Sequence, residues 1–209
     1  MGISAAPATI NQLGDLERCA LRSGNVHSAD GWREVLEPVI ARYRDTVKRR
    51  YFRGDAAFAN PDIYEFLEAE GMGYVIRLPA NRILQEKIGS LLKRLVGRPP
   101  HEVRRYYASL SYQAQSWKKP RRVVAKIEWH AGELYPRVGF IVTNLARPAE
   151  RVVAFYNQRA RTRMMAGLSR SAAACSAGTS STARKALSVL RKPICARLSS
   201  CSIKLWPLR

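Results

Sequence analysis

Asp55 is the residue whose place in the chain points most directly to chemistry. It ends the run Arg50-Tyr51-Phe52-Arg53-Gly54-Asp55, which has the composition of a short strand, and a loop of small residues follows. Open α/β sheets bind ligands at the carboxyl ends of parallel strands, and a carboxylate there is a suitable ligand for Mg²⁺. A lone aspartate in such a place more often caps the next turn, so both interpretations of Asp55 stay open.

The other titratable residues indicate a site less strongly. Asp62, Glu65 and Glu68 recur at a spacing of three residues, which predicts a solvated face of a helix. The histidines and cysteines show no metal-ligand spacing such as CxxC, so neither a zinc site nor a disulfide framework is expected. They are His27, His101, His130, Cys19, Cys175, Cys195 and Cys201. Phosphate-loop, dinucleotide-binding and nucleophile-elbow motifs are also absent from the sequence.

Basic residues beside aromatic ones indicate a polyanionic partner. The 209 residues include 36 Lys and Arg against 16 Asp and Glu, a net charge of +20. Basic side chains neutralise phosphates and aromatic rings stack on bases. A basic solvated face on an ordinary domain explains the same pattern equally well. The candidate DNA-binding residues, which lie near Tyr106, Tyr107, Trp117 and Trp129, are Arg104, Arg105, Lys118, Lys119, Arg121 and Arg122.

A strand–helix–strand unit is expected to position Asp55. After the strand at 50–55, Asn60 suits a helix N-cap and Pro61 suits the first helical position. The helix is expected to end at Gly71, since glycine is the usual residue just past a helix end. A second strand at 74–79 follows, and the short connections predict that the two strands are parallel.

The remaining pattern predicts an α/β fold with an antiparallel meander. Apolar residues keep a helical period over 32–43 and 82–95, and residues 15–21 alternate as a strand does. A last helix is expected to begin near Pro148. Three strand-like runs with short turns between them occupy 103–117, 123–130 and 137–144.

Charge is divided unevenly along the chain. Glu150 is the last carboxylate, and residues 151–209 contain 12 basic residues and no acidic ones. Serine and alanine dominate 171–181, with little apolar periodicity. Three interpretations of this stretch stay open: a basic nucleic-acid-binding tail, a disordered linker, or a stretch translated in a frame that was never selected to fold.

The sequence predicts neither a membrane protein nor a secreted one. It contains no run of about 18 uncharged apolar residues, the length that a transmembrane helix needs. Its first residues lack the basic start and apolar block of a secretory signal. A reducing compartment is therefore expected.

Three blocks of the sequence stand out: Gly14–Asn25, Arg53–Ala59 and Ala154–Arg159. Together they resemble the catalytic domain of bacterial insertion-sequence DDE transposases. The resemblance covers residues 11–159 and implies a partial ribonuclease-H-like fold with a β-rich insertion at about 80–147. Residues 160–209 would then be a basic, acid-free tail that is largely irregular, disordered or out of frame.

The resemblance also implies a chemistry that this chain carries only in part. In that family three carboxylates hold two Mg²⁺ ions, which cut and join DNA at the ends of the insertion sequence. Asp55 matches the second carboxylate, and Tyr156 and Arg159 match the start of the motif on the last helix. The motif continues with Glu and Lys where this sequence has Arg163 and Arg170. With two of the three carboxylates missing, the resemblance implies a fragment, truncated and frame-disrupted at its C-terminus, that is inactive by itself.

Further expectations concern partners and folding. The resemblance implies double-stranded DNA at transposon ends as the partner, leaves a homo-oligomer open, and implies the bacterial cytoplasm near the nucleoid. The alternative class is a non-enzymatic basic nucleic-acid-binding protein; an RNA-associated protein would need an RNA preference that no motif indicates. The family's first strand has no match in this chain, which predicts an unpaired sheet edge and an exposed apolar face, and with them low solubility or association.

Overall fold

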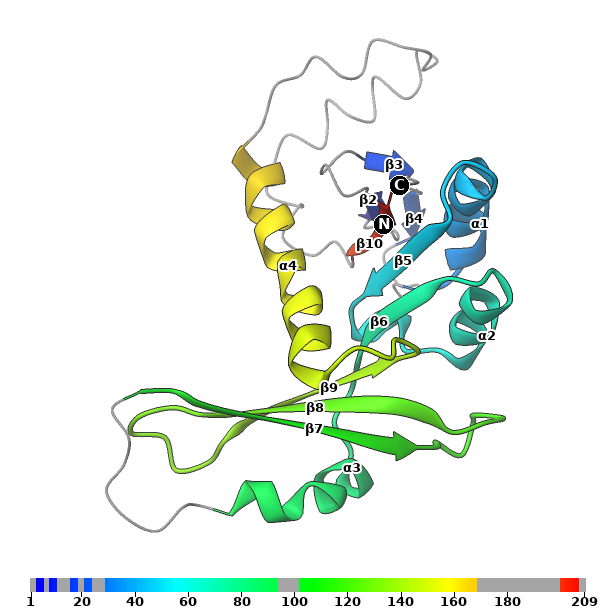
Figure 1. The fold of residues 1–209 in the computed structure, drawn as a ribbon. Helices are drawn as coiled ribbons and strands as arrows, with labels where there is room; N and C mark the ends of the chain where they lie inside the picture. Colours follow the sequence, from blue (N-terminus) through cyan, green and yellow to red (C-terminus); the bar gives the residue numbers. More distant parts are fainter. Residues whose placement is uncertain are drawn as a thin grey trace.

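The computed structural model of the chain is a mixed α/β fold in which most strands join one sheet (Figure 1). The structure describes residues 3–5, 8–10, 16–18, 21–23, 29–93, 102–168 and 200–206. The order of strands across the sheet is β3-β2-β10-β5-β6-β9-β8-β7. In chain order these strands are β2 Ala8–Ile10, β3 Leu16–Arg18, β5 Arg49–Gly54, β6 Gly73–Leu78, β7 Arg104–Tyr112, β8 Arg121–Trp129, β9 Arg137–Thr143 and β10 Ser200–Trp206. A separate antiparallel pair is formed by β1 Ile3–Ala5 and β4 Leu21–Ser23.

Helices cover both faces of the sheet and bury two apolar clusters. On one face, α1 Trp32–Tyr43, α2 Pro61–Ala69 and α3 Arg82–Lys87 contribute to the larger cluster, with β5, β6, β8 and β9 beneath them. On the other face, α4 Ala149–Leu168 packs Val152, Val153 and Phe155 against Val75, Val124 and Ile141. The sheet therefore separates α4 from the other helices (Figure 1).

The predicted strand–helix–strand unit is confirmed. Strands β5 and β6 are parallel neighbours, and α2 connects them. The Asn60 side chain accepts a hydrogen bond from the backbone N–H of Asp62 at 3.0 Å, and Pro61 begins the helix. Gly71 has φ +63°, the left-handed conformation that glycine adopts most easily, so the chain can leave the helix and enter β6 at once.

The predicted meander is also confirmed. Strand β7 pairs antiparallel with β8, and β8 pairs antiparallel with β9. Strand β9 then pairs antiparallel with β6, so the meander extends the same sheet that contains β5.

Three predicted elements are shorter than expected. The strand expected over 103–117 is β7, which ends at Tyr112. The helix expected over 82–95 is α3, which ends at Lys87 and is followed by the 3-10 turn η2 Gly89–Leu92. Glycine and serine in that turn disfavour a continued α-helix. The strand expected over 15–21 is divided into β3 and β4, which belong to different sheets.

The expectation of an unpaired edge is wrong at β5, because β10 lies there. β10 pairs antiparallel with β5 on one side and parallel with β2 on the other. Within the part expected to be a largely irregular tail, α4 continues to Leu168 and 200–206 form a strand. Backbone hydrogen bonds to β2 and β5 hold β10 in the sheet, and the sequence pattern of 200–206 did not predict this pairing. The rest of the tail, 169–199 and 207–209, lies outside the described residues.

Candidate functional site

Asp55 follows β5 directly and caps the next turn. Its backbone is still extended, with φ −85° and ψ −172°. Its carboxylate accepts a hydrogen bond from the backbone N–H of Ala57 at 3.2 Å and caps the 3-10 turn η1 Ala56–Phe58. A Cβ on Gly54 would lie 3.1 Å from atoms of both Phe52 and Phe58, so glycine lets this turn pack tightly on the strand. Of the two interpretations of Asp55, capping is thus observed, and metal ligation stays a prediction.

Asp55 lies on the face of the sheet that α4 covers. Arg53, two residues earlier, is buried and donates a hydrogen bond from Nη1 to the Phe155 carbonyl at 2.9 Å. Residues two apart on an extended strand share a face, so Asp55 shares the face of Arg53. Tyr156 follows Phe155 on α4 and is half-buried at this face. Arg159 lies in the next turn of α4, with its side chain outside the described part of the chain.

Removing the cap gives a first testable prediction. Asp55→Ala is expected to lower the free energy of unfolding by about 1 kcal/mol, because the N–H of Ala57 loses its acceptor. Asp55→Ser keeps an acceptor oxygen and is expected to lose less. Urea unfolding of the three chains measures the difference, and equal stability of Asp55→Ala and the unchanged chain would contradict the capping role.

The residues around Asp55 do not fit a two-metal site. Within the ranges that the structure describes, no three His, Cys, Asp or Glu residues gather closely enough to hold a metal ion. Neither strand beside β5 carries a carboxylate, since β6 reads Gly-Tyr-Val-Ile-Arg-Leu and β10 reads Ser-Cys-Ser-Ile-Lys-Leu-Trp. Mg²⁺ binds through several oxygen ligands, usually including one or two carboxylates, so Asp55 alone is too few for a pair of ions.

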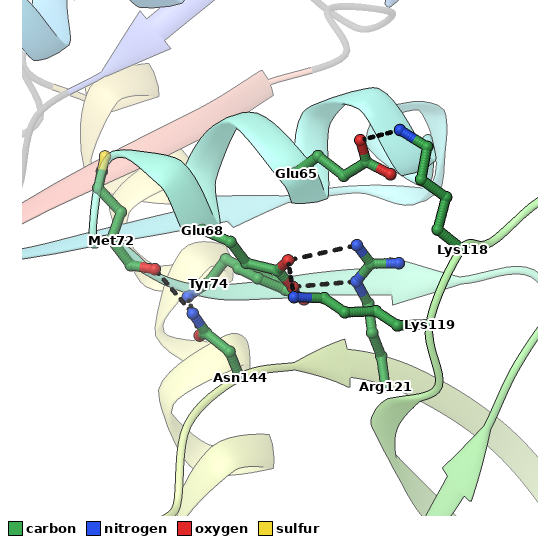
Figure 2. Close-up of polar contacts among 8 residues, drawn as sticks. All are labelled: Glu65, Glu68, Met72, Tyr74, Lys118, Lys119, Arg121 and Asn144. Atoms are coloured by element: carbon green, nitrogen blue, oxygen red, sulfur yellow. Dashed lines mark hydrogen bonds and ion pairs between the residues drawn. The ribbon is translucent and has the colours of Figure 1, made fainter.

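Three of the candidate DNA-binding residues pair with carboxylates of α2. Figure 2 shows Lys118, Lys119 and Arg121 pointing toward this helix. Lys118 Nζ lies 2.8 Å from Glu65, and Lys119 Nζ lies 2.8 Å from Glu68. The expectation that Glu65 and Glu68 line a merely solvated helix face is therefore wrong. The turn between β7 and β8 brings opposite charges to α2 from more than 50 residues away in sequence, which helical spacing alone does not reveal.

Arg121 and Glu68 form the buried centre of this charge cluster. Arg121 is 5% exposed and donates from Nε and Nη2 to the two oxygens of Glu68, at 3.0 and 3.3 Å. Its guanidinium group lies over the rings of Tyr64 and Trp117, at 5.1 and 5.5 Å. Tyr74 donates its hydroxyl to the same carboxylate at 2.9 Å. The positive charge of Arg121 is therefore compensated inside the protein, by Glu68.

The pKa values in this cluster follow from burial and from these hydrogen bonds. Burial acts to raise the pKa of Glu68, but hydrogen bonds from Arg121, Lys119 and Tyr74 outweigh it and hold the pKa below its ordinary value. Burial, together with the hydrogen bond to Glu68, raises the pKa of the Tyr74 hydroxyl far above its ordinary value. The cluster is thus charged as an ion pair, with a neutral tyrosine beside it, over the ordinary pH range.

The other three candidate DNA-binding residues have different environments. Arg104 is exposed at the start of β7. Arg105 pairs with Glu128 at 2.9 Å. Arg122 donates from Nη1 to the carbonyls of Leu145 and Arg147, at 2.5 and 2.8 Å, and so fastens the loop that leads into α4. Of these three, Arg104 is the one whose side chain makes no hydrogen bond or ion pair with any residue in the described ranges.

A cavity of about 230 Å³ on the α4 side of the sheet was not predicted from the sequence. Its polar lining includes Arg77, Lys126, Arg137, Tyr156 and Asn157. One feature of the sequence could have indicated this cavity: Arg77 and Lys126 are charged residues within strand sequences that are otherwise mostly apolar. Alternation in those runs indicates a polar position on one face of the sheet.

Comparison with known proteins gives one match. The family model described as "Transposase DDE domain group 1" matches residues 7–167. Neither the curated proteins nor the solved structures contain a match to the chain. In the part that the structure describes, no helix is long and apolar enough to cross a membrane.

Proposed function

The chain belongs to the family of transposase DDE domains of group 1, and from this premise we propose that it binds DNA but does not cut it by itself. The chain has 36 basic and 16 acidic residues, and this excess of positive charge supports binding to a polyanion. The expected partner is double-stranded DNA at the ends of a transposon, in the bacterial cytoplasm near the nucleoid. Assembly into a homo-oligomer is part of the proposal.

One observation carries the proposed lack of cleavage: Asp55 caps a turn and, within the described ranges, belongs to no group of three potential metal ligands. Strands β6 and β10, which lie on either side of β5, contain no carboxylate. Helix α4 has Arg163 where the family motif has glutamate. A guanidinium group at that position would repel a cation. Two divalent ions, where all three carboxylates are present, would activate the attacking oxygen and stabilise the leaving oxygen. Asp55 is the one member of that set that this chain would contribute.

The arrangement of β5, β6 and α4 supports a ribonuclease-H-like ancestry as part of the same proposal. A parallel strand pair lies beside antiparallel strands, and α4 packs on the face opposite α1 and α2. The meander β7-β8-β9 would be the β-rich insertion. The division at residue 159 between the domain and a tail stays part of the proposal.

The experiment that tests this function combines binding and cleavage. The chain is expected to shift labelled duplex DNA in a gel, with binding that weakens steeply as salt rises. In Mg²⁺ or Mn²⁺ it is expected to leave supercoiled plasmid intact. Nicking that disappears in Asp55→Ala would contradict the proposed lack of cleavage.

Two comparisons within the same assay distinguish a transposase-type DNA partner from the alternative partners. Tighter binding to transposon-end DNA than to random duplex would support the transposase partner. Equal binding to both would favour a non-enzymatic basic nucleic-acid-binding protein. Tighter binding to RNA than to DNA would contradict both interpretations.

A further inference from the structure

We propose that the cavity between α4 and strands β6, β8 and β9 is a groove that holds one phosphate group of a DNA strand. This inference rests on the proposed DNA-binding function and adds the place where the backbone is held. The groove has a volume of about 230 Å³, below the roughly 300–1,000 Å³ of pockets that bury drug-sized ligands. It therefore suits a phosphate group with part of its sugar rather than a whole nucleotide.

The floor of the groove is open because of a glycine. Gly139 lies opposite Lys126 in the pairing of β8 with β9. A Cβ built on Gly139 would meet no atom within 4 Å, and its φ is not positive. A larger side chain there would consequently enter the groove without backbone strain.

Three cations from three adjacent strands surround this floor. Arg77 comes from β6, Lys126 from β8 and Arg137 from β9. Since residues that alternate along paired strands share a face, all three belong to the α4 side of the sheet. Three positive charges around a small groove indicate an anionic ligand.

Most of these cations already have a partner, and Arg77 does not. Glu128, the one carboxylate among the lining residues, accepts from Lys126 at 2.9 Å and from Arg105 at 2.9 Å. Arg137 pairs with Glu133, its Nε lying 3.1 Å from Oε2. Arg77 is exposed, and its side chain makes no hydrogen bond or ion pair with any residue of the described ranges. A guanidinium group with all its donors unused is suited to hold two oxygens of a phosphate at once.

The α4 wall of the groove adds neutral hydrogen-bond donors. Val153, Tyr156 and Asn157 line this side. A phenol and an amide both donate to phosphate oxygens, so they position a strand without reading its sequence. Arg77 and Asn157 are both exposed, so the groove is open to solvent, as a continuous DNA backbone requires.

The test uses the full chain and a short labelled duplex of random sequence, with affinity measured over a series of salt concentrations. Gly139→Asp places a carboxylate on the open floor and is expected to weaken DNA binding by about tenfold, since like charges repel. Arg77→Gln is expected to reduce the slope of log affinity against log salt by about 0.9, the value for one phosphate contact. Two controls should bind within about twofold of the unchanged chain: Gly139→Ala, and Arg82→Gln on α3, whose side chain is 91% exposed.

The outcomes separate failure of the groove from failure of the function. DNA binding by Gly139→Asp and Arg77→Gln that equals that of the controls would overturn the groove but not the DNA-binding function. Absence of duplex binding by the unchanged chain at low salt would overturn both. Inorganic phosphate serves as a competing probe: if Gly139→Asp abolishes phosphate binding but leaves DNA binding intact, the groove holds a free anion and its assignment to DNA is wrong.

Discussion

Glu68→Gln is expected to lower the free energy of unfolding by about 2–4 kcal/mol, because it leaves the buried Arg121 guanidinium without a counter-ion. Glu68 accepts from Arg121 twice, from Lys119 and from Tyr74, and its side chain keeps 19% exposure. Removal of one partner of a buried pair costs more than the pair contributes, since the remaining charge stays desolvated. Urea unfolding followed by circular dichroism measures the change.

Glu65→Gln is the matched control for Glu68→Gln. Glu65 lies one helical turn earlier on α2 and pairs with Lys118, whose side chain is 81% exposed. An exposed pair contributes little, so this control is expected to unfold close to the unchanged chain. Equal losses in Glu65→Gln and Glu68→Gln would show that burial of Arg121 does not determine the stability of the cluster.

The pH dependence of stability gives the same experiment a second readout. The pKa of Glu68 lies below its ordinary value of 4.5, so the folded state favours the charged carboxylate. The stability that this provides is present above about pH 4.5 and is lost as pH falls through the lower pKa of the folded state. Glu68→Gln is expected to remove this part of the acid sensitivity. An unchanged pH profile in the variant would contradict the ion pair.

Phe58→Ala is expected to lower the free energy of unfolding by about 3–5 kcal/mol by opening a cavity beneath the turn that follows Asp55. Phe58 is 2% exposed, and its ring lies edge-on to that of Phe52 with centroids 5.9 Å apart. The turn η1 has no other buried side chain. Its position against β5 therefore depends on this one aromatic residue.

Leu134→Ala tests whether the loss at Phe58 comes from burial. Leu134 is 69% exposed, so its truncation is expected to change stability by less than about 0.5 kcal/mol. A Phe58→Ala chain that unfolds at the same urea concentration as Leu134→Ala, with the same dependence on urea, would contradict the anchoring role.

Local chemistry was enough to predict the unit around Asp55. Asn60, Pro61 and Gly71 have backbone roles that do not depend on distant residues, and each has its expected role. The meander was predictable for a similar reason, since consecutive strands with short turns pair with each other. For a lone aspartate after a strand, capping of the next turn is more common than metal ligation, and the structure shows Asp55 as a cap.

Long-range pairing was not predictable from spacing. Nothing in the run Ser200–Trp206 indicates that it would lie between β2 and β5. The attachment of Lys119 and Arg121 to α2 also depends on where a distant hairpin turn lies. The groove at Gly139 has the same origin, since it combines residues from three strands and a helix that only the sheet order brings together.

The place of β10 in the sheet has a consequence for how the protein is made. β10 is the strand that joins β2 to β5, so among the described strands the pair β2 and β3 is connected to β5 and the strands beyond it through β10. During synthesis the two parts have no common strand until residues 200–206 have been made. Contacts that span so much of the chain form slowly. Until β10 has been made, the edge of β5 that it covers is therefore accessible to chaperones and to neighbouring nascent chains, and this part of the sheet assembles late.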